Sequence, residues 1–321
     1  MTGRWARGIV EGSYSRRAFL RAAGTAAALA SLGTLGCLGT TGPAAGPAAS
    51  LATPLQATRK GLVVAVDEDP AKLVDRALDA FGGLAGIIKK GDRVVVKANY
   101  SFKNIPESSN QPQVLARIMR HCSEAGASSV TAIDYTIDAP ELCLAKSGIK
   151  NAVEAAGFKA IDLNTHEFVD TAINGSSLGS CRIAKDVLDS DVFLNVPVVK
   201  AHGSTLLTAS MKNLMGIIKD RGAFHSGDLD ACIADLAAYA KPSLVIADAY
   251  RVLRTGGPQG GPDSTIDQPH ALVVGHDMVA VDAYCASFLN LKPEDVPHIM
   301  EAHKAGAGQY DLSKVEIKRI E

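Results

Sequence analysis

The chain has 321 residues, of which 47% are hydrophobic and 5% aromatic, with 33 basic and 34 acidic side chains. This length can bury one large core or two smaller ones, and the low aromatic share favours helices packed on a sheet over an aromatic-rich sandwich. Without residues 1–52, which hold five arginines and one glutamate, 28 basic and 33 acidic residues remain, so no nucleic-acid partner is expected.

The first 52 residues have the pattern of an export signal and linker. The sequence S-R-R-A-F-L at 15–20 is followed by an apolar, Ala-rich run at 22–38. This order is typical of a twin-arginine signal peptide, and the run is shorter than the ~20 apolar residues of a spanning helix. We therefore expect the twin-arginine translocase as a partner, a periplasmic or extracytoplasmic location, and no transmembrane span after signal removal.

A lipid anchor at Cys37 is a disfavoured alternative for this segment. The sequence T-L-G-C at 34–37 is similar to a lipoprotein cleavage box, but its Leu lies one residue too close to the cysteine. A tract of Gly, Pro and Ala at 40–50 then predicts a linker. The expected organisation is a signal and linker at 1–52 and a folded domain at 60–321.

Short β-branched runs alternate with longer helical patterns from residue 60 onward. Strands are expected at 62–66, 93–99, 129–134, 159–163, 191–199, 243–248, 270–275 and 314–320. Helices are expected at 70–88, 112–125, 140–146, 149–156, 206–218, 228–240, 277–289 and 296–305. The polar region 165–182 is expected to form short strands or a loop.

This alternation predicts an α/β fold with a mainly parallel sheet and helices on both faces, arranged as one body or two lobes. Ligands in such folds bind beyond the carboxyl ends of the strands. Three predicted strand ends carry polar residues, namely Lys97 with Asn99, Lys200 with His202, and Asp248. We expect these side chains to converge, although the sequence contains neither a Walker A loop nor G-x-G-x-x-G.

Residues 195–225 concentrate cationic and ligand-type side chains where a buried strand meets a helix. Gly203 allows a tight turn, and Ser204, Thr205 or Thr208 is expected to cap the helix that follows. The amino end of that helix would offer free N–H groups and a partial positive charge. A pocket for a small anionic ligand or cofactor is therefore predicted at this end of the sheet.

The candidate residues fall into three sets. The candidates for catalysis are His202, Lys212 and His225, and the candidates for metal binding are His202 and His225. The candidates for cofactor binding are Lys97, Asn99, Lys200, Asn213, Gly216, Asp248 and Asp282. Taken singly, each lysine can equally be a surface residue and each histidine a loop residue, whereas the set together favours a site.

Two further features have open alternatives. The Gly-rich segment 254–262 is either a lid over a ligand or a plain surface loop. Asp277 fits a helix N-cap, whereas Asp282, within an apolar helix, is expected to be paired or functional.

The cysteines give no clear metal signature. Five lie beyond residue 52, at positions 122, 143, 181, 232 and 285, without a C-x-x-C pair or a ferredoxin run. Those at 122, 232 and 285 are expected to be small core residues. A cluster held by scattered cysteines, or one disulfide of unknown pairing, stays open.

Three sequence regions resemble the signatures of the domain-of-unknown-function 362 (DUF362) family. These are V-V-V-K-A-N at 94–99, the stretch from N-V-P-V-V-K-A-H at 195–202 to K-N-L-M-G at 212–216, and D-M-V-A-V-D at 277–282. The resemblance covers about residues 60 to 320 and departs at Ala98 and Met278, where the family usually has Pro. Members are often described as iron–sulfur proteins, some with an attached ferredoxin module, and no such module is expected here.

A more remote resemblance is to the nickel-pincer lactate racemases. In that family a His is followed, ten positions on, by a Lys joined to a pyridine-derived nickel cofactor, and His202 and Lys212 have this spacing. His225 lies where a nickel-ligating His would follow. The resemblance implies a nickel-type cofactor, although the residues around Lys212 are less rich in Gly than in the family.

Three hypotheses for the function follow. The first is an exported enzyme that depends on a metal or cofactor, with His202 or His225 as base or ligand and Asp248 or Asp282 as the orienting group. The second is a periplasmic binding or accessory protein that uses the same pocket without turnover. The third is an iron–sulfur electron-transfer protein.

Overall fold

The computed structural model describes residues 61–219, 221–225 and 227–321. The expected signal segment and Cys37 lie outside these residues. The strands are β1 (Leu62–Val66), β2 (Arg93–Lys97), β3 (Ser129–Asp134), β4 (Lys159–Asp162), β5 (Phe168–Ala172), β6 (Ser180–Ala184), β7 (Val192–Asn195), β8 (Val198–His202), β9 (Leu206–Thr208), β10 (Leu244–Leu253), β11 (Ile266–Asp267), β12 (Ala271–Gly275) and β13 (Ile317–Ile320).

The helices alternate with these strands along most of the chain. The α-helices are α2 (Pro70–Phe81), α3 (Pro112–Glu124), α4 (Pro140–Ser147), α5 (Ile149–Ala155), α6 (Lys185–Asp189), α7 (Ser210–Asn213), α8 (Arg221–His225), α9 (Leu229–Ala240), α10 (Met278–Ala286) and α11 (Pro297–Lys304). The 3₁₀ turns are η2 (Pro106–Ser108), η3 (Leu214–Ile217), η4 (Ser287–Leu289), η5 (Pro293–Asp295) and η6 (Leu312–Lys314).

One sheet of eleven strands forms the centre of the described structure, which confirms the predicted α/β class. Its main order is β13-β1-β12-β10-β7-β2-β3-β4; β8 and β11 pair with β10, and β9 pairs with β8. The strands from β10 to β4 in this order are all parallel, whereas β12 is antiparallel to both β1 and β10. The strands β5 and β6 form a separate antiparallel pair. The sheet is therefore mainly parallel, as predicted.

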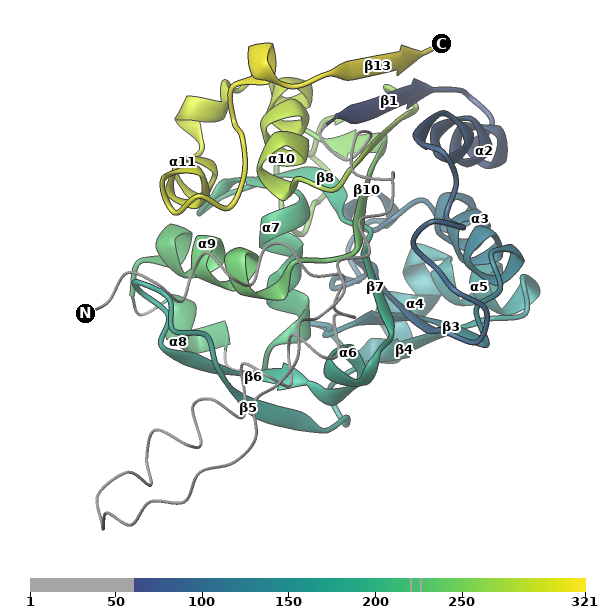
Figure 1. Ribbon diagram of the computed structural model, residues 1–321, viewed down its shortest axis with the longest axis horizontal. Coiled ribbons are helices and arrows are strands. Elements are labelled where there is room, and N and C mark those ends of the chain that lie inside the picture. The colour runs from purple at the N-terminus through teal and green to yellow at the C-terminus, as the bar shows by residue number, and fades with distance from the viewer. Residues whose placement is uncertain (1–60, 220, 226) are drawn as a thin grey trace, which may run out of the picture.

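Helices cover both faces of this sheet (Figure 1). The apolar cluster on one face includes residues of α2, α3 and α5, and the cluster on the other includes residues of α7, α9, α10 and α11. Within β2, Val94 and Val96 belong to the first cluster and Val95 to the second. A strand that is buried on both faces needs a continuous apolar run, which explains why R-V-V-V-K shows no polar alternation.

Several predicted boundaries are wrong: the strand predicted at 243–248 extends to Leu253, the strand predicted at 314–320 begins at Ile317, and three others have a clear local reason. The helix predicted at 70–88 ends at Phe81 because Gly82, with φ of 100°, provides a left-handed cap. The strand predicted at 191–199 is two strands, since Pro197 has no N–H to donate to a ladder. The helix predicted at 206–218 begins only at Ser210, because residues 206–208 pair with β8 as a hairpin.

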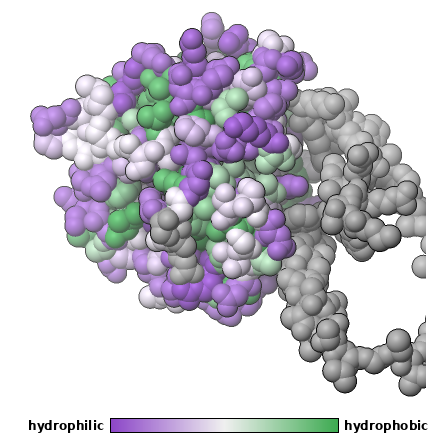
Figure 2. All heavy atoms as spheres, turned by 90° about the vertical axis from the view of Figure 1, so that its left-hand side faces the viewer, coloured by the Kyte–Doolittle hydropathy of each residue, from purple (hydrophilic) through white to green (hydrophobic). Residues whose placement is uncertain are grey.

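The side of the molecule on which α9 and α11 lie carries mostly hydrophilic residues, with small hydrophobic areas between them (Figure 2). The apolar residues of α9 are buried instead, among them Ile233, Leu236 and Ala237. Among the described residues, no helix combines the length and apolar character needed to span a membrane.

Candidate functional site

A cavity of about 240 Å³ lies at the carboxyl ends of β2, β3 and β8. Eight of the ten residues expected at the site line it: Lys97, Asn99, Lys200, His202, Lys212, Asn213, Gly216 and His225. They come from three parts of the chain that the parallel strands bring to one edge of the sheet. The cavity lining does not include Asp248 or Asp282.

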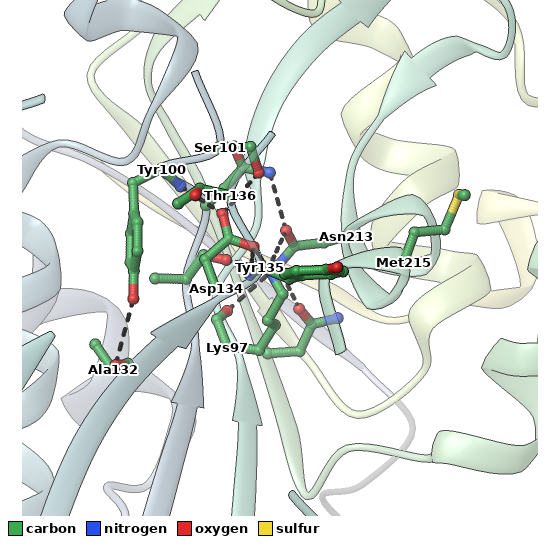
Figure 3. A network of polar contacts seen from close by, with 12 residues as sticks. Lys97, Tyr100, Ser101, Ala132, Asp134, Tyr135, Thr136, Asn213 and Met215 are labelled. Carbon is green, nitrogen blue, oxygen red and sulfur yellow. Dashed lines mark hydrogen bonds and ion pairs between the residues drawn. The ribbon is translucent and has the colours of Figure 1, made fainter. Parts of the chain in front are cut away.

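A buried ion pair forms the floor of the site. The Lys97 Nζ atom lies 2.9 Å from Asp134 Oδ1, and neither side chain is exposed to solvent (Figure 3). The same carboxylate accepts hydrogen bonds from the Tyr100 and Tyr135 N–H groups and from Ser101 Oγ, at 2.7–2.8 Å. Burial alone would raise the pKa of Asp134, but Lys97 and these donors lower it, so the carboxylate is charged.

Asp134 was not expected at the site from the sequence. Asp134 is the last residue of the strand 129–134. Because polar residues at strand ends were already expected to form the site, this position could have identified it from the sequence. Its importance follows from its partner, because a buried lysine needs an opposite charge nearby.

Gly216 makes the close packing of this ion pair possible. A Cβ atom at this position would lie 2.3 Å from Lys97 Cε and 2.5 Å from Asp134 Oδ1. Contacts this short are far inside van der Waals distance, so a larger residue would displace the pair. Gly216, a cofactor-binding candidate from the sequence, lines the cavity and also makes room for the ion pair.

Asparagine side chains connect the lysines to each other. Asn213 Oδ1 accepts hydrogen bonds from Lys97 Nζ and Asn99 Nδ2, each at 3.0 Å. In turn, Asn99 Oδ1 accepts from Lys200 Nζ at 3.0 Å. Asn213 also donates to Asn195 Oδ1 at 2.9 Å. This network fixes the positions of the two buried ammonium groups relative to α7.

Lys200 and Lys212 are held by neutral partners. Besides Asn99, Lys200 Nζ donates to the Ser108 carbonyl at 2.5 Å, and Lys212 Nζ donates to Met215 Sδ at 3.1 Å. Burial, with repulsion from neighbouring cations, lowers the pKa of Lys200 to about 7 and that of Lys212 to about 8. Both amines therefore titrate close to neutral pH.

His202 is neutral at physiological pH. Burial and then the charges of Lys212 and Lys200 lower its pKa to about 3. Its Nδ1 atom accepts a hydrogen bond from the Ser204 N–H at 3.1 Å, which places the proton of the neutral ring on Nε2. The ring can thus donate one hydrogen bond from Nε2.

Arg221 is a fourth cation in the cavity wall that sequence reasoning missed. Its guanidinium lies 4.3 Å from the centre of the Tyr135 ring and donates to the Met215 carbonyl at 3.2 Å and to the Tyr135 carbonyl. Burial lowers the pKa of this group. Its position in the sequence could have identified it as a site residue, because it lies four residues before His225 in the stretch already richest in cations.

Thr208 brings an unpaired hydroxyl into the cavity lining. The side chain is 4% exposed, and its Oγ1 atom has no hydrogen-bond partner among the described residues. An unpaired buried hydroxyl costs free energy, on the order of 1–3 kcal/mol. A ligand that accepts a hydrogen bond here would recover that free energy.

The amino end of the predicted helix is not open to an anion, contrary to expectation. The helix begins at Ser210, and the N–H groups of Ser210 and Met211 donate to Asp282 at 2.7 and 3.0 Å. Asp282 is fully buried, and burial raises its pKa despite these donors. This carboxylate therefore anchors α7, the element that carries Lys212, from behind the cavity.

Asp248 likewise has a structural environment apart from the cavity. It accepts from the N–H groups of Gln111 and Tyr250 at 2.8 and 3.0 Å, and from Asn110 Nδ2 at 3.2 Å. Burial raises its pKa. These contacts fix the start of α3 against β10, so the expected convergence of strand ends does not extend to Asp248.

The Gly-rich segment 254–262 borders the cavity. Pro258 and Gln259 are part of its lining. A Cβ on Gly257 would lie 1.9 Å from the Ala201 carbonyl oxygen, so this glycine allows the segment to approach β8 closely. The segment thus lies beside the cavity, which the lid hypothesis requires and the surface-loop alternative does not.

The described residues do not by themselves complete a metal centre. His202 and His225 both line the cavity, but within the described ranges no group of three His, Cys, Asp or Glu side chains could hold a metal ion. Metal sites in proteins usually have at least three protein ligands. The five cysteines of the described ranges are buried in separate elements: Cys122 in α3, Cys143 in α4, Cys181 in β6, Cys232 in α9 and Cys285 in α10.

Comparison with known proteins gives one family and one curated relative. The sequence model of the family "Domain of unknown function (DUF362)" matches residues 94–287, more than half of the chain. The relative is a thylakoid-associated protein of Synechocystis sp., 26% identical over 241 residues, which cover 71% of this chain and 73% of that protein.

Solved structures give weaker likenesses. The lactate racemase apoprotein from Thermoanaerobacterium thermosaccharolyticum matches with a TM-score of 0.40 and 16% identity, over 68% of this chain and 57% of that one. A Thermotoga maritima protein matches with a TM-score of 0.43 and 14% identity, over 69% and 59%. The chain thus spans under two thirds of either structure. Because both TM-scores are below 0.5, they support no conclusion about the site.

Proposed function

Since the chain belongs to the DUF362 family, whose description assigns no activity, we propose from the geometry of the cavity that the protein binds a small anionic ligand or cofactor there. The observation that carries the proposal is the charge of the wall. Of the described lysines and arginines that line the cavity, only Lys97 has an ion-pair partner, Asp134, whereas Lys200, Lys212 and Arg221 have neutral hydrogen-bond partners.

The residues of the wall have distinct roles in this proposal. Lys212 and Arg221 bind the anion, because the contacts that hold them are weak or neutral acceptors. The ion pair of Lys97 and Asp134 keeps the floor rigid. His202 donates from Nε2 to the ligand, and a bound negative charge raises the pKa of this histidine by offsetting its cationic neighbours.

The protein is proposed to be an enzyme that acts on this ligand with a metal or cofactor, in which His202 moves a proton once the anion is bound. His202 and His225 are the described residues available to a metal. A binding or accessory protein without turnover, or an iron–sulfur protein, are the alternatives. Metal analysis of the purified protein separates them, since iron with acid-labile sulfide would favour the last.

The binding proposal predicts a titration with pH. Sulfate, which keeps two negative charges over this pH range, should bind in an isothermal titration at pH 6.5, and its affinity should fall as the pH rises through about 7 and about 8, because Lys200 and then Lys212 lose their protons. The variant Lys212→Met should bind roughly tenfold more weakly, as expected for the loss of one charge-assisted contact.

The matched control is Lys72→Met, which removes an exposed lysine of α2 outside the cavity lining. It should bind as the unchanged protein does. Binding of phosphate and of other small anions that is absent, or insensitive to Lys212→Met, would overturn the proposal.

We also propose that the protein is exported by the twin-arginine route. The support is the S-R-R-A-F-L sequence at 15–20, together with the location stated for the thylakoid-associated relative. In a bacterial host, the double variant Arg16→Lys, Arg17→Lys should accumulate in the cytoplasm while the unchanged chain reaches the periplasm. Arg21→Lys, outside the pair, is the control, and equal export of all three chains would refute the route.

A further inference from the structure

The wall of the cavity has more positive charge than one singly charged ligand can balance. Asp134 neutralises Lys97 at 2.9 Å. Three cations remain, Lys200, Lys212 and Arg221, and their hydrogen-bond acceptors in the described chain are carbonyl and amide oxygens and one thioether. Buried cations without a counter-charge are unfavourable, so the site favours a ligand that supplies more than one negative charge.

The charges of the cavity cations act on one another. Lys212 and Lys97 lower the pKa of Lys200, and Arg221 lowers that of Lys212. The carboxylates that act in the opposite direction are Asp134 on Lys200, Asp230 on Lys212, and Asp134 with Asp162 on Arg221. The net direction is downward for both amines, so the charge of the carboxylates does not compensate for burial and repulsion.

The neutral groups of the cavity are suited to the same kind of ligand. Thr208 has a buried hydroxyl without a partner among the described residues, and His202 presents a proton on Nε2. Both can donate to an oxyanion with several acceptor oxygens. Phe102, Ile137 and Met215 add an apolar part to the lining, and Ile137 is 60% exposed. The ligand therefore has an apolar portion as well.

We infer that the ligand carries two negative charges, as a phosphate monoester or a dicarboxylate does, next to a small apolar portion. This inference rests on the proposed function of the cavity and adds the charge class of the ligand. Both kinds of ligand are dianions, and in either case their oxygens would contact Lys212, Arg221 and the Thr208 hydroxyl.

A pair of probes with nearly the same shape tests the charge. At pH 7.5 phenyl phosphate is doubly charged, because the second pKa of such esters is about 6, whereas phenyl sulfate has a single charge. Isothermal titration should give phenyl phosphate an affinity at least tenfold higher. Phthalate, with two carboxylates, and benzoate, with one, test the same preference for carboxylate ligands. The affinities of phenyl phosphate and phthalate then show whether the site prefers a phosphate monoester or a dicarboxylate.

Two further measurements make the test specific. In Lys212→Met the preference for phenyl phosphate over phenyl sulfate should fall below threefold, while Lys72→Met should keep it. Titrations in two buffers of different ionisation enthalpy should show that the protein takes up protons when phenyl phosphate binds at pH 7.5, since a bound dianion raises the pKa of Lys212.

The outcomes separate this inference from the proposed function. If the doubly and singly charged members of both pairs bind equally well, the protein binds anions but the dianion inference is wrong. If none of the four probes binds, the proposed function fails and the inference fails with it. If Lys212→Met still prefers phenyl phosphate over phenyl sulfate as strongly, the dianion is recognised by other residues, and its assignment to this cavity wall is wrong.

Discussion

Gly216 shows how a single missing side chain shapes the site. The ion pair between Lys97 and Asp134 occupies the space in which a Cβ atom at residue 216 would lie. The glycine lies in η3, immediately after the helix that carries Lys212 and Asn213. A change at this residue therefore affects the floor of the cavity and the element above it at the same time.

At the residue scale, we predict that Gly216→Ala lowers the free energy of unfolding by about 1–3 kcal/mol, the usual cost of overpacking a buried site. It should also weaken anion binding, because the ion pair has to move. Chemical denaturation and calorimetric titration measure the two effects. The control is Gly179→Ala, an exposed position where a Cβ would meet nothing within 4 Å. Equal stability of the two variants would contradict the close-packing argument.

At the element scale, the short helix α7 depends on a carboxylate from another helix. Asp282 in α10 accepts from the first two N–H groups of α7, which has only four residues. A helix this short has little stability of its own, so tertiary contacts decide its position. The positions of Lys212 and Asn213 thus depend on a residue that does not touch the cavity.

We predict that Asp282→Ala lowers the free energy of unfolding by about 1 kcal/mol or more, as the loss of a helix cap does, and weakens phosphate binding about fivefold. Asp277→Ala is the matched control, since Asp277 caps α10 through the N–H groups of Val279 and Ala280. Both variants should lose stability, and only Asp282→Ala should lose affinity. Unchanged affinity in Asp282→Ala would show that α7 is positioned by other contacts.

At the scale of the whole molecule, the Lys97–Asp134 pair joins the ends of two neighbouring parallel strands, β2 and β3. Asp134 also accepts from the chain beyond β2 through the Tyr100 N–H and Ser101 hydroxyl. The pair therefore ties the edge of the central sheet to the segments that form the cavity. Removing one partner would leave an isolated charge in a fully buried place.

We predict that Lys97→Met and Asp134→Asn each lower the free energy of unfolding by roughly 3–5 kcal/mol, the range for breaking a buried ion pair. The double variant should lose clearly less than the sum of the two, because it leaves no unpaired charge. A double-mutant cycle by urea denaturation measures this coupling. Additive losses would mean that the two charges do not stabilise each other.

The chain alone was sufficient for the fold class and for most of the elements. The strand at 62–66 and the helix starts at Pro70, Pro112 and Leu229 follow from apolar periodicity and from Pro or Asp at the amino end. Lys97, Lys200 and His202 could be placed together from sequence because a parallel sheet brings strand ends to one edge. These features are local patterns, or follow from one rule about the fold.

The partners of those residues were decided only by the tertiary structure. Residues 206–208 became a strand because β8 was available to pair with them, and the amino end of α7 was taken by Asp282 from 72 positions away. Asp134 and Arg221 joined the cavity through contacts with Lys97 and Tyr135. The periodicity of apolar residues in a sequence predicts which face of a helix or strand is buried. It does not predict which distant side chain contacts that face, because this contact depends on how the elements pack.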